Sequence, residues 1–177
     1  MNKVFIAKSL DGYIARKNGE IDWLDLIPNP EKKSLGYLEF INDIDAIIMG
    51  RGSFEIVLSF EEAWPYTQPL YVLSTTLKEI PEPLKNKVEL IYGSIPEVLE
   101  QLHNKGHKNL YIDGGKTIHS FLKEDLIDEL IITTIPILLG GGIPLFHELS
   151  DSLEFEHVKS ELFLDQLVQN HYRRKRS

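Results

Sequence analysis

Two glycine-flanked segments carry the residue types that bind phosphate. Residues 47–53, Ile-Ile-Met-Gly-Arg-Gly-Ser, place an arginine between two glycines after an apolar run. Residues 111–117, Tyr-Ile-Asp-Gly-Gly-Lys-Thr, place a glycine pair, a lysine and a threonine after another apolar run. Glycines let a phosphate approach the backbone, and the first N–H groups of a following helix attract an anion. Each segment alone could be a tight turn, but the pair favours a dinucleotide site.

Two further segments could line a substrate. Leu139–Phe146 contains three consecutive glycines and Pro144, so it is either a flexible loop on the substrate side or a β-bulge before the last strands. Residues 9–23 contain the turn signal Asp11-Gly12 and are predicted to form a long loop that ends at Trp23. That loop could close over a cofactor, or it could be a surface loop with one buried tryptophan.

Several other chemistries lack their residues. The chain has no cysteine, so disulfides, thiolate metal sites and a cysteine nucleophile are excluded. His103 and His107 have the spacing of metal ligands, but Gly106 lies between them, and no metal site is predicted. The sequence contains neither the G-x-S-x-G motif of serine hydrolases nor the usual Rossmann and P-loop glycine motifs.

Composition describes an ordinary globular protein, with 42% hydrophobic and 26% charged residues, and 1–177 is predicted to be one domain. The net charge of −8 disfavours nucleic acid as a partner, and the basic run Arg173–Arg176 is predicted to be a solvated tail. No apolar run reaches the roughly eighteen residues of a membrane span, and the N-terminus does not resemble a signal peptide. A cytoplasmic location is therefore expected, with no membrane partner.

Apolar runs rich in β-branched residues predict the strands that position these motifs. They are residues 3–8, 46–49, 70–74, 88–92, 109–112 and 129–138, followed by a hairpin of 154–164 and 166–174 that turns at Asp165. Helices are predicted around Leu35–Ile41, near Ser53, from Ser94 to Gly106 and after Gly114-Gly115, with Ser94 and Glu97 as a capping box. Alternating strands and helices predict an α/β fold with a central, mostly parallel sheet, helices on both faces and an antiparallel C-terminal hairpin.

At these residues the chain resembles the dihydrofolate-reductase superfamily, and especially stand-alone relatives of the reductase domain of the riboflavin-biosynthesis deaminase-reductase. The resemblance covers nearly the whole chain. It rests on five motifs in order, at residues 9–15, 48–55, 72–75, 112–116 and 136–146.

The resemblance implies an NADPH-binding oxidoreductase with a dihydrofolate-reductase-like fold. The nicotinamide would lie near Ala7, Ile14 and the glycine pair, and Arg51 would favour NADPH by contacting its 2′-phosphate. The implied cofactor residues are Ala7, Ile14, Gly50, Arg51, Gly52, Ser53, Leu73, Ser74, Thr75, Gly114, Gly115, Lys116 and Thr117. The implied substrate residues are Trp23, Phe40 and Thr133. The resemblance also implies a cis peptide bond between Gly114 and Gly115.

One departure concerns the proton that a reductase must deliver. Dihydrofolate reductases carry a carboxylate on the helix after the lid, and that position falls near Gly36 in this chain. The candidate proton donors are then water, Glu39 on the same helix, or Asp22 in the lid. A phosphorylated pyrimidine, the substrate class of the riboflavin enzyme, would need cations, for which the loop offers Arg16 and Lys17.

Four functions stay open at this point. The leading one is an NADPH-dependent reductase of a pyrimidine- or pteridine-like C=N or C=O bond, similar to 5-amino-6-(5-phosphoribosylamino)uracil reductase. The alternatives are a true dihydrofolate reductase, a non-catalytic NADPH-binding protein, or a structural partner protein. The resemblance and the apolar residues of the C-terminal hairpin also predict a homodimer.

Overall fold

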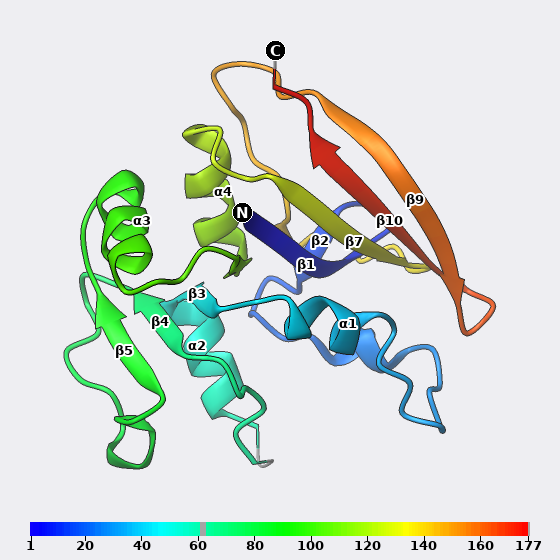
Figure 1. The fold of residues 1–177 in the computed structure, drawn as a ribbon. Helices are drawn as coiled ribbons and strands as arrows, with labels where there is room; N and C mark the ends of the chain where they lie inside the picture. The colour runs from blue at the N-terminus through cyan, green and yellow to red at the C-terminus, as the bar shows by residue number, and fades with distance from the viewer. Residues whose placement is uncertain (61–62, 177) are drawn as a thin grey trace.

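An eight-stranded sheet forms the centre of the computed structural model, which describes residues 1–60 and 63–176 (Figure 1). In spatial order its strands are β5 (Val88–Ile91), β4 (Leu70–Leu73), β3 (Ala46–Gly50), β6 (Leu110–Asp113), β1 (Asn2–Ser9), β7 (Glu129–Ile135), β10 (Leu167–Arg174) and β9 (Phe155–Phe163). The strands from β5 to β7 are parallel, whereas β10 and β9 are antiparallel to their neighbours. The predicted fold class is confirmed.

Helices cover both faces of this sheet. Those longer than one turn are α1 (Tyr37–Asn42), α2 (Arg51–Leu58), α3 (Ile95–Asn104) and α4 (Gly115–Lys123), with short 3-10 turns η1 (Asp22–Asp25) and η2 (Glu82–Leu84). Side chains of α1 and α2 pack against Ile47 and Met49 of β3, while those of α3 and α4 pack with Ile48 on the opposite face. This division follows from the alternation of side chains along a strand. None of the described helices combines the length and apolar character needed to cross a membrane.

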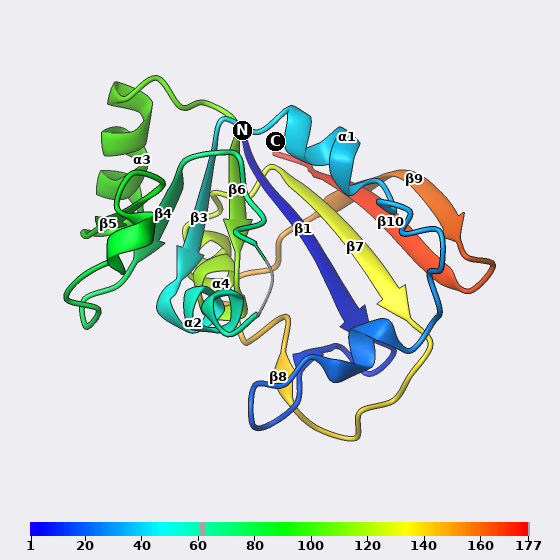
Figure 2. The same ribbon diagram turned by 90° about the horizontal axis from the view of Figure 1, so that it is seen from below.

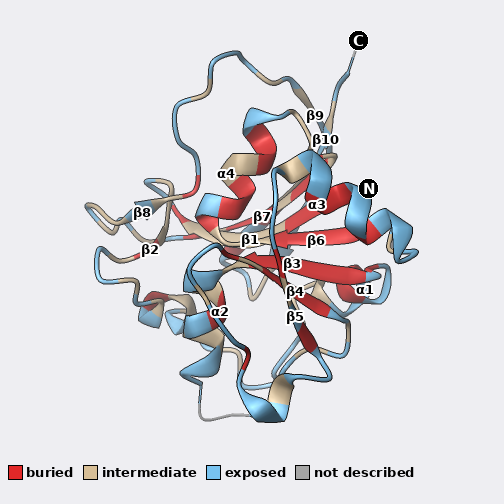
Figure 3. Cartoon of the chain, turned by 90° about the vertical axis from the view of Figure 1, so that its left-hand side faces the viewer, coloured by how far each residue is buried: buried red, intermediate tan, exposed pale blue. Residues whose placement is uncertain are grey.

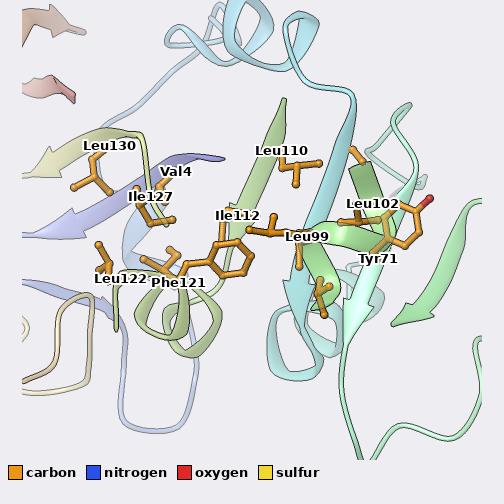
Figure 4. Packing of buried hydrophobic residues seen from close by; sticks show 14 of the residues in the cluster. Val4, Tyr71, Leu99, Leu102, Leu110, Ile112, Phe121, Leu122, Ile127 and Leu130 are labelled. Carbon is orange, nitrogen blue, oxygen red and sulfur yellow. The ribbon is translucent and has the colours of Figure 1, made fainter. Parts of the chain in front are cut away.

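The inner strands are buried along most of their length, because helices cover them from both sides (Figure 3). Figure 4 shows the larger cluster, in which Phe121 and Leu122 of α4 and Leu99 and Leu102 of α3 meet residues of the sheet. Burial of this kind stabilises a fold by about 25 cal/mol per Å² of apolar surface. The buried sheet therefore holds the residues at the ends of its strands in fixed positions.

Three predicted boundaries were wrong. Strand β7 ends at Ile135 rather than at residue 138, because Pro136 has no N–H for the ladder. The predicted loops 9–23 and 139–146 contribute strands β2 (Tyr13–Ala15) and β8 (Ile143–Pro144), which pair as a two-stranded ribbon. Helix α1 begins only at Tyr37, because Leu35 and Gly36 adopt positive φ angles.

The basic C-terminal run is also not the solvated tail that was predicted. Arg174 is partly buried, and its guanidinium donates to both carboxylate oxygens of Asp125, at 2.6 and 3.0 Å. Arg176 donates to Asp128 and to the Asp125 carbonyl. Two of these cations therefore fasten the end of β10 to the segment between α4 and β7.

Candidate functional site

The carboxyl ends of β3 and β6 lie side by side at a change of direction in the chain. From β3 the chain leads to β4 on one side, whereas from β6 it leads to β7 beyond β1 on the other side. In open α/β sheets such a switch point leaves a crevice in which ligands bind. Both predicted phosphate segments lie at this edge, because the adjacent strands β3 and β6 end within them, at Gly50 and Asp113 (Figure 2).

The glycines allow side chains of one segment to lie close to the backbone of the other. A methyl group at Gly114 would lie 2.3 Å from Ser53 Oγ, and one at Gly50 would lie 2.9 Å from Thr117 Oγ1. A side chain at either position would force Ser53 or Thr117 to move, and Gly114 also has φ of 89°, which favours glycine. No cis peptide bond occurs in the described chain, so the Gly114–Gly115 bond is trans and that prediction was wrong.

Helices α2 and α4 start at these glycines without a side-chain cap. Gly50 is the N-cap of α2 and Gly114 that of α4, and neither N-terminus receives a hydrogen bond from a capping side chain. The N–H groups of the first turn are left for solvent or for a ligand, and the helix dipoles favour an anion there. Lys116 is exposed in the first turn of α4, while Thr117 is buried against Gly50.

Arg51 is held between α2 and the loop after β4. Its Nε donates to Glu55 Oε1 at 2.7 Å, and its Nη1 donates to Thr76 Oγ1 at 3.0 Å. Ser74 stabilises that loop by accepting the N–H groups of Thr76 and Leu77. Strand pairing sets Leu73 opposite Gly50, so the predicted residues Leu73, Ser74 and Thr75 adjoin Gly52 and Ser53 at one edge.

The remaining predicted cofactor and substrate residues lie along β1 and its neighbours. Ala7 pairs with Thr133 across β1 and β7. Ile14 of β2 adjoins Gly115, where a methyl group would lie 2.8 Å from Ile14 Cδ1. Trp23 is 3% exposed, packs with Ile135 and Leu167, and has an indole Nε1 with no acceptor among the described residues.

Asp113 is a functional candidate that the sequence reasoning missed. It occupies the last position of β6, directly before the glycine pair, and burial raises its pKa to about 6 against the opposing hydrogen bonds of Gly114 N–H and Tyr111. A carboxyl group with such a pKa carries a proton for part of the time near neutral pH. The alternation of β6 was the available signal, since Asp113 shares a sheet face with Tyr111.

Three tyrosines on the α1 face of the sheet are affected by the charge of this carboxyl group. Burial, and secondly the charge of Asp113, raise the pKa of Tyr37 to about 12 and also raise the pKa values of Tyr66 and Tyr111. The Tyr111 hydroxyl lies 3.3 Å from Asp113 and donates to the Phe5 carbonyl at 2.9 Å. Phe40 of α1 packs edge-on against the Tyr111 ring, which places this predicted substrate residue on the same face.

The two predicted proton donors lie elsewhere. Asp22 accepts two hydrogen bonds from Arg16, at 2.6 and 2.9 Å, and these hold the pKa of its carboxyl below the usual value. It is exposed and ionised at neutral pH, which suits an ion pair better than proton donation. Glu39 is exposed on α1 and lines a cavity beside Phe40.

Asp11 ties together the two loops that were expected to line the site. Its carboxylate accepts the Ser9 hydroxyl and the N–H groups of Leu139 and Gly140, and these bonds lower its pKa. The carbonyl of Ala15 would lie 2.2 Å from a methyl group at Gly142, so the triple glycine permits close contact between the loops. Hydrogen bonds therefore hold the segment against the loop that follows β1, and it forms no β-bulge in the main sheet.

Comparison with known proteins identifies relatives over the whole chain. The family model described as the RibD C-terminal domain matches residues 3–168. The uncharacterized protein YwjB of Bacillus subtilis is 37% identical over 172 residues, which cover 96% of this chain and 95% of that protein.

Solved structures are also similar to this chain over nearly its whole length. The crystal structure of a putative riboflavin biosynthesis protein from Shewanella sp. PV-4 is 52% identical, covers 99% of both chains and superposes with a TM-score of 0.96. Dihydrofolate reductase from Enterococcus faecalis, solved in complex with NADP(H), covers 99% of this chain and 97% of its own at 18% identity and a TM-score of 0.69. At that identity the likeness establishes a shared fold.

Proposed function

Because the chain belongs to the family of RibD C-terminal domains, we propose that it is an NADPH-dependent reductase. Its substrate would be a pyrimidine- or pteridine-like compound whose C=N or C=O bond accepts a hydride. The observation that carries the proposal is the meeting of two uncapped, glycine-started helices at the crevice between β3 and β6. Two anion-attracting N-termini at one switch point suit the two phosphates of a dinucleotide.

The described residues fit this cofactor. The first turns of α2 and α4 offer N–H donors for a pyrophosphate, and the glycines at positions 50, 114 and 115 leave room for it. Arg51 would provide the cation for a 2′-phosphate, since its guanidinium already points to the loop after β4. Glu55 neutralises part of that charge and would limit the gain.

Bound NADPH would supply the hydride that the substrate carbon receives. The substrate nitrogen or oxygen then needs a proton, and Asp113 is the residue best suited to give it, because burial holds its pKa near 6. Asp22 remains ionised in its ion pair with Arg16 and would serve the loop structure instead. Thr133 and the Trp23 indole would supply hydrogen-bond donors to the substrate.

Cofactor titration tests this proposal. Calorimetry of the purified chain should give micromolar binding of NADPH and weaker binding of NADH. Arg51→Ala should weaken NADPH about ten-fold and NADH much less, because the lost interaction is with the 2′-phosphate. Arg173→Ala, an exposed arginine on β10, is the matched control and should change neither affinity. Absence of binding by either nucleotide would refute the proposal.

We also propose that the chain pairs as a homodimer through the β9–β10 hairpin. Val158 and Leu162 on β9 and Val168 on β10 are between 40% and 61% exposed, and Leu162 lies opposite Val168. A second copy would cover these side chains, and twofold pairing is the commonest closed arrangement. Light scattering across a concentration series should give twice the 20.3 kDa chain mass. The chain mass at every concentration would refute it.

A further inference from the structure

Strands β1 and β6 separate as they approach the carboxyl edge of the sheet. Their pairing ends at Lys3 opposite Tyr111, whereas β1 stays paired with β7 as far as Ser9. The Phe5 carbonyl lies two residues past that last pair, and it accepts a hydrogen bond from the Tyr111 hydroxyl at 2.9 Å. A side chain of β6 therefore supplies the donor for a backbone acceptor of β1.

The same hydroxyl also reaches Asp113. Its oxygen lies 3.3 Å from Asp113 Oδ1, and the two side chains share a face of β6 because they are two positions apart. A hydroxyl has one hydrogen, so Tyr111 shares it between two acceptors, of which the Phe5 carbonyl is the nearer. No other side chain of residues 1–60 and 63–176 hydrogen-bonds Asp113. Tyr111 thus links this carboxyl group to the backbone of β1.

Tyr111 itself is held in place by packing. It is buried in the cluster on the α1 face, and its ring meets Phe40 edge-on, with ring centroids 5.1 Å apart. Its backbone belongs to a strand that pairs with β3 on one side and with β1 on the other. The hydroxyl therefore has a fixed position, and the Asp113 carboxyl group turns to meet it.

Two further tyrosines are affected by the charge of Asp113 without bonding to it. Burial, and secondly that charge, raise the pKa values of Tyr37 on α1 and Tyr66 in the loop before β4. Within the described parts of the chain, neither hydroxyl is hydrogen-bonded to Asp113 and no cation forms an ion pair with it. Tyr111 is therefore the side chain that can set the orientation of this carboxyl group.

We infer that Tyr111 is a positioning residue, whose hydroxyl holds Asp113 Oδ1 so that the proton of the acid lies on Oδ2 and is free for the substrate. This inference rests on the proposed reductase function, in which Asp113 gives up its proton. As the substrate carbon receives its hydride, the Oδ2–H bond breaks and the proton passes to the substrate nitrogen or oxygen. Asp113 is left as a carboxylate, and the hydrogen bond from Tyr111 stabilises the charge that appears on it.

An NMR titration of the Asp113 carboxyl group in the full chain, without any ligand, tests the hydrogen bond. The resonance is identified by its absence from Asp113→Asn. Tyr111→Phe removes a donor that favours the ionised form, so the midpoint of the titration should rise by about 0.5 to 1 pH unit.

Tyr37→Phe is the matched control, because Tyr37 is affected by the charge of Asp113 without bonding to it. This variant should leave the midpoint of the Asp113 titration unchanged. A midpoint that stays in place in Tyr111→Phe, or that moves equally in both variants, would overturn the inference.

A second readout is the kinetics of NADPH oxidation with dihydrofolate as the probe substrate. At pH 5, where the acid is mostly protonated, Tyr111→Phe should lower kcat about five- to ten-fold and leave KM within about two-fold, because the bond strengthens only as charge develops. The loss should shrink as pH rises from 6 to 8, since the variant keeps its proton to higher pH. Tyr71→Phe is the control and should keep wild-type kinetics, because this buried tyrosine of β4 contacts His107 on the α3 face.

A double variant separates positioning from damage to the fold. If Tyr111 acts through Asp113, then Tyr111→Phe should change kcat by no more than about two-fold in an Asp113→Asn background. A loss by the same factor in both backgrounds would mean that Tyr111 acts independently of Asp113, and the inference would fail.

A separate calorimetric titration with NADPH keeps the two proposals apart. If NADPH fails to bind while the Asp113 midpoint rises in Tyr111→Phe, the reductase function is refuted and the control of the carboxyl group by Tyr111 stands. If NADPH binds and is oxidised while the midpoint is the same in wild type and variant, the reductase function stands and the role of Tyr111 is refuted.

Discussion

The starts of helices α3 and α4 each carry a carboxylate, yet the two acids are placed in opposite ways. Both helices follow parallel strands, so both begin at the carboxyl edge of the sheet. At α3, Glu97 accepts the Ser94 N–H and hydroxyl, each at 2.8 Å, and these bonds lower its pKa. At α4, Asp113 precedes a glycine N-cap and is enclosed on the α1 face, where burial raises its pKa to about 6.

At the start of α3 the chain supplies its own hydrogen-bond partners, whereas at the start of α4 it leaves the first N–H groups for a ligand. Glu97 and Ser94 complete a capping box, so this end of α3 offers little to an anion. Helix α4 lacks such a cap, and its acid lies before the helix on the strand. An acid used for capping is held ionised, whereas an acid used for proton transfer must keep its proton near the working pH.

Replacing each acid by its amide should give the largest difference between the two helix starts, measured as enzymatic activity. Asp113→Asn should lower kcat/KM of the proposed reduction by a factor of about 100 to 1,000, because the variant has no proton to give. Wild-type activity should also fall as pH rises above about 6, where Asp113 loses its proton, and the variant should lack this dependence. The measurement is NADPH oxidation with an amino-substituted pyrimidine across a pH series.

Glu97→Gln is the matched control and should keep wild-type activity and its pH profile. A pH profile that survives in Asp113→Asn would assign the proton to another group. Equal losses of activity in both variants would mean that the two helix starts do not differ in function.

Asp113 and Glu97 should also affect the pH dependence of the free energy of unfolding in opposite directions. The pKa of Asp113 is about 6 when folded and near 3.8 when unfolded, so the folded state binds more protons between these values. The free energy of unfolding therefore falls as pH rises through that window, by up to about 3 kcal/mol. Asp113→Asn removes this loss and should be more stable than wild type at pH 8 but not at pH 4.

Urea unfolding at both pH values measures this difference. The pKa of Glu97 is lowered in the fold, so its contribution has the opposite sign: it is present at neutral pH and is lost as pH falls through the folded pKa. A stability curve of Asp113→Asn that runs parallel to the wild-type curve would contradict the raised pKa.

The sequence predicted more of the fold than of the site, for a physical reason. The inner strands are apolar on nearly every residue, and the Ser94–Glu97 box is a local signal, so both could be recognised from spacing. The β2–β8 ribbon could not, because it joins short segments far apart in the chain, and its pairing depends on contacts such as Ala15 with Gly142.

The raised pKa of Asp113 has the same origin. It arises from burial by elements distant in sequence, and the charge of Asp113 in turn raises the pKa values of Tyr37 in α1 and Tyr66 in the loop before β4. Glu39 and Asp22 were chosen from the sequence by analogy of position. Neither choice could include the ion pair of Asp22 with Arg16 or the exposure of Glu39.

Two glycines with the same backbone conformation allow a smaller test. Gly114 and Gly106 have φ of 89° and 91°, so substitution of either by alanine should lower the free energy of unfolding by about 1 kcal/mol. A methyl group at Gly114 would also collide with Ser53 Oγ, whereas one at Gly106 would meet no atom within 4 Å. Gly114→Ala should weaken NADPH binding about ten-fold, and Gly106→Ala should leave it unchanged; equal affinities by calorimetry would remove the cofactor from the α4 start.

The smallest expected effect concerns the capped helix itself. Ser94→Ala removes the hydroxyl of the capping box and should lower the free energy of unfolding by about 1 kcal/mol, as other N-cap replacements do. Because the α3 start is satisfied by the chain and not by a ligand, NADPH affinity should stay within about two-fold of wild type. Urea unfolding and calorimetry on one preparation measure both quantities. A variant that keeps its stability but binds NADPH more weakly would place the α3 start in the cofactor site, and the contrast between α3 and α4 would then fail.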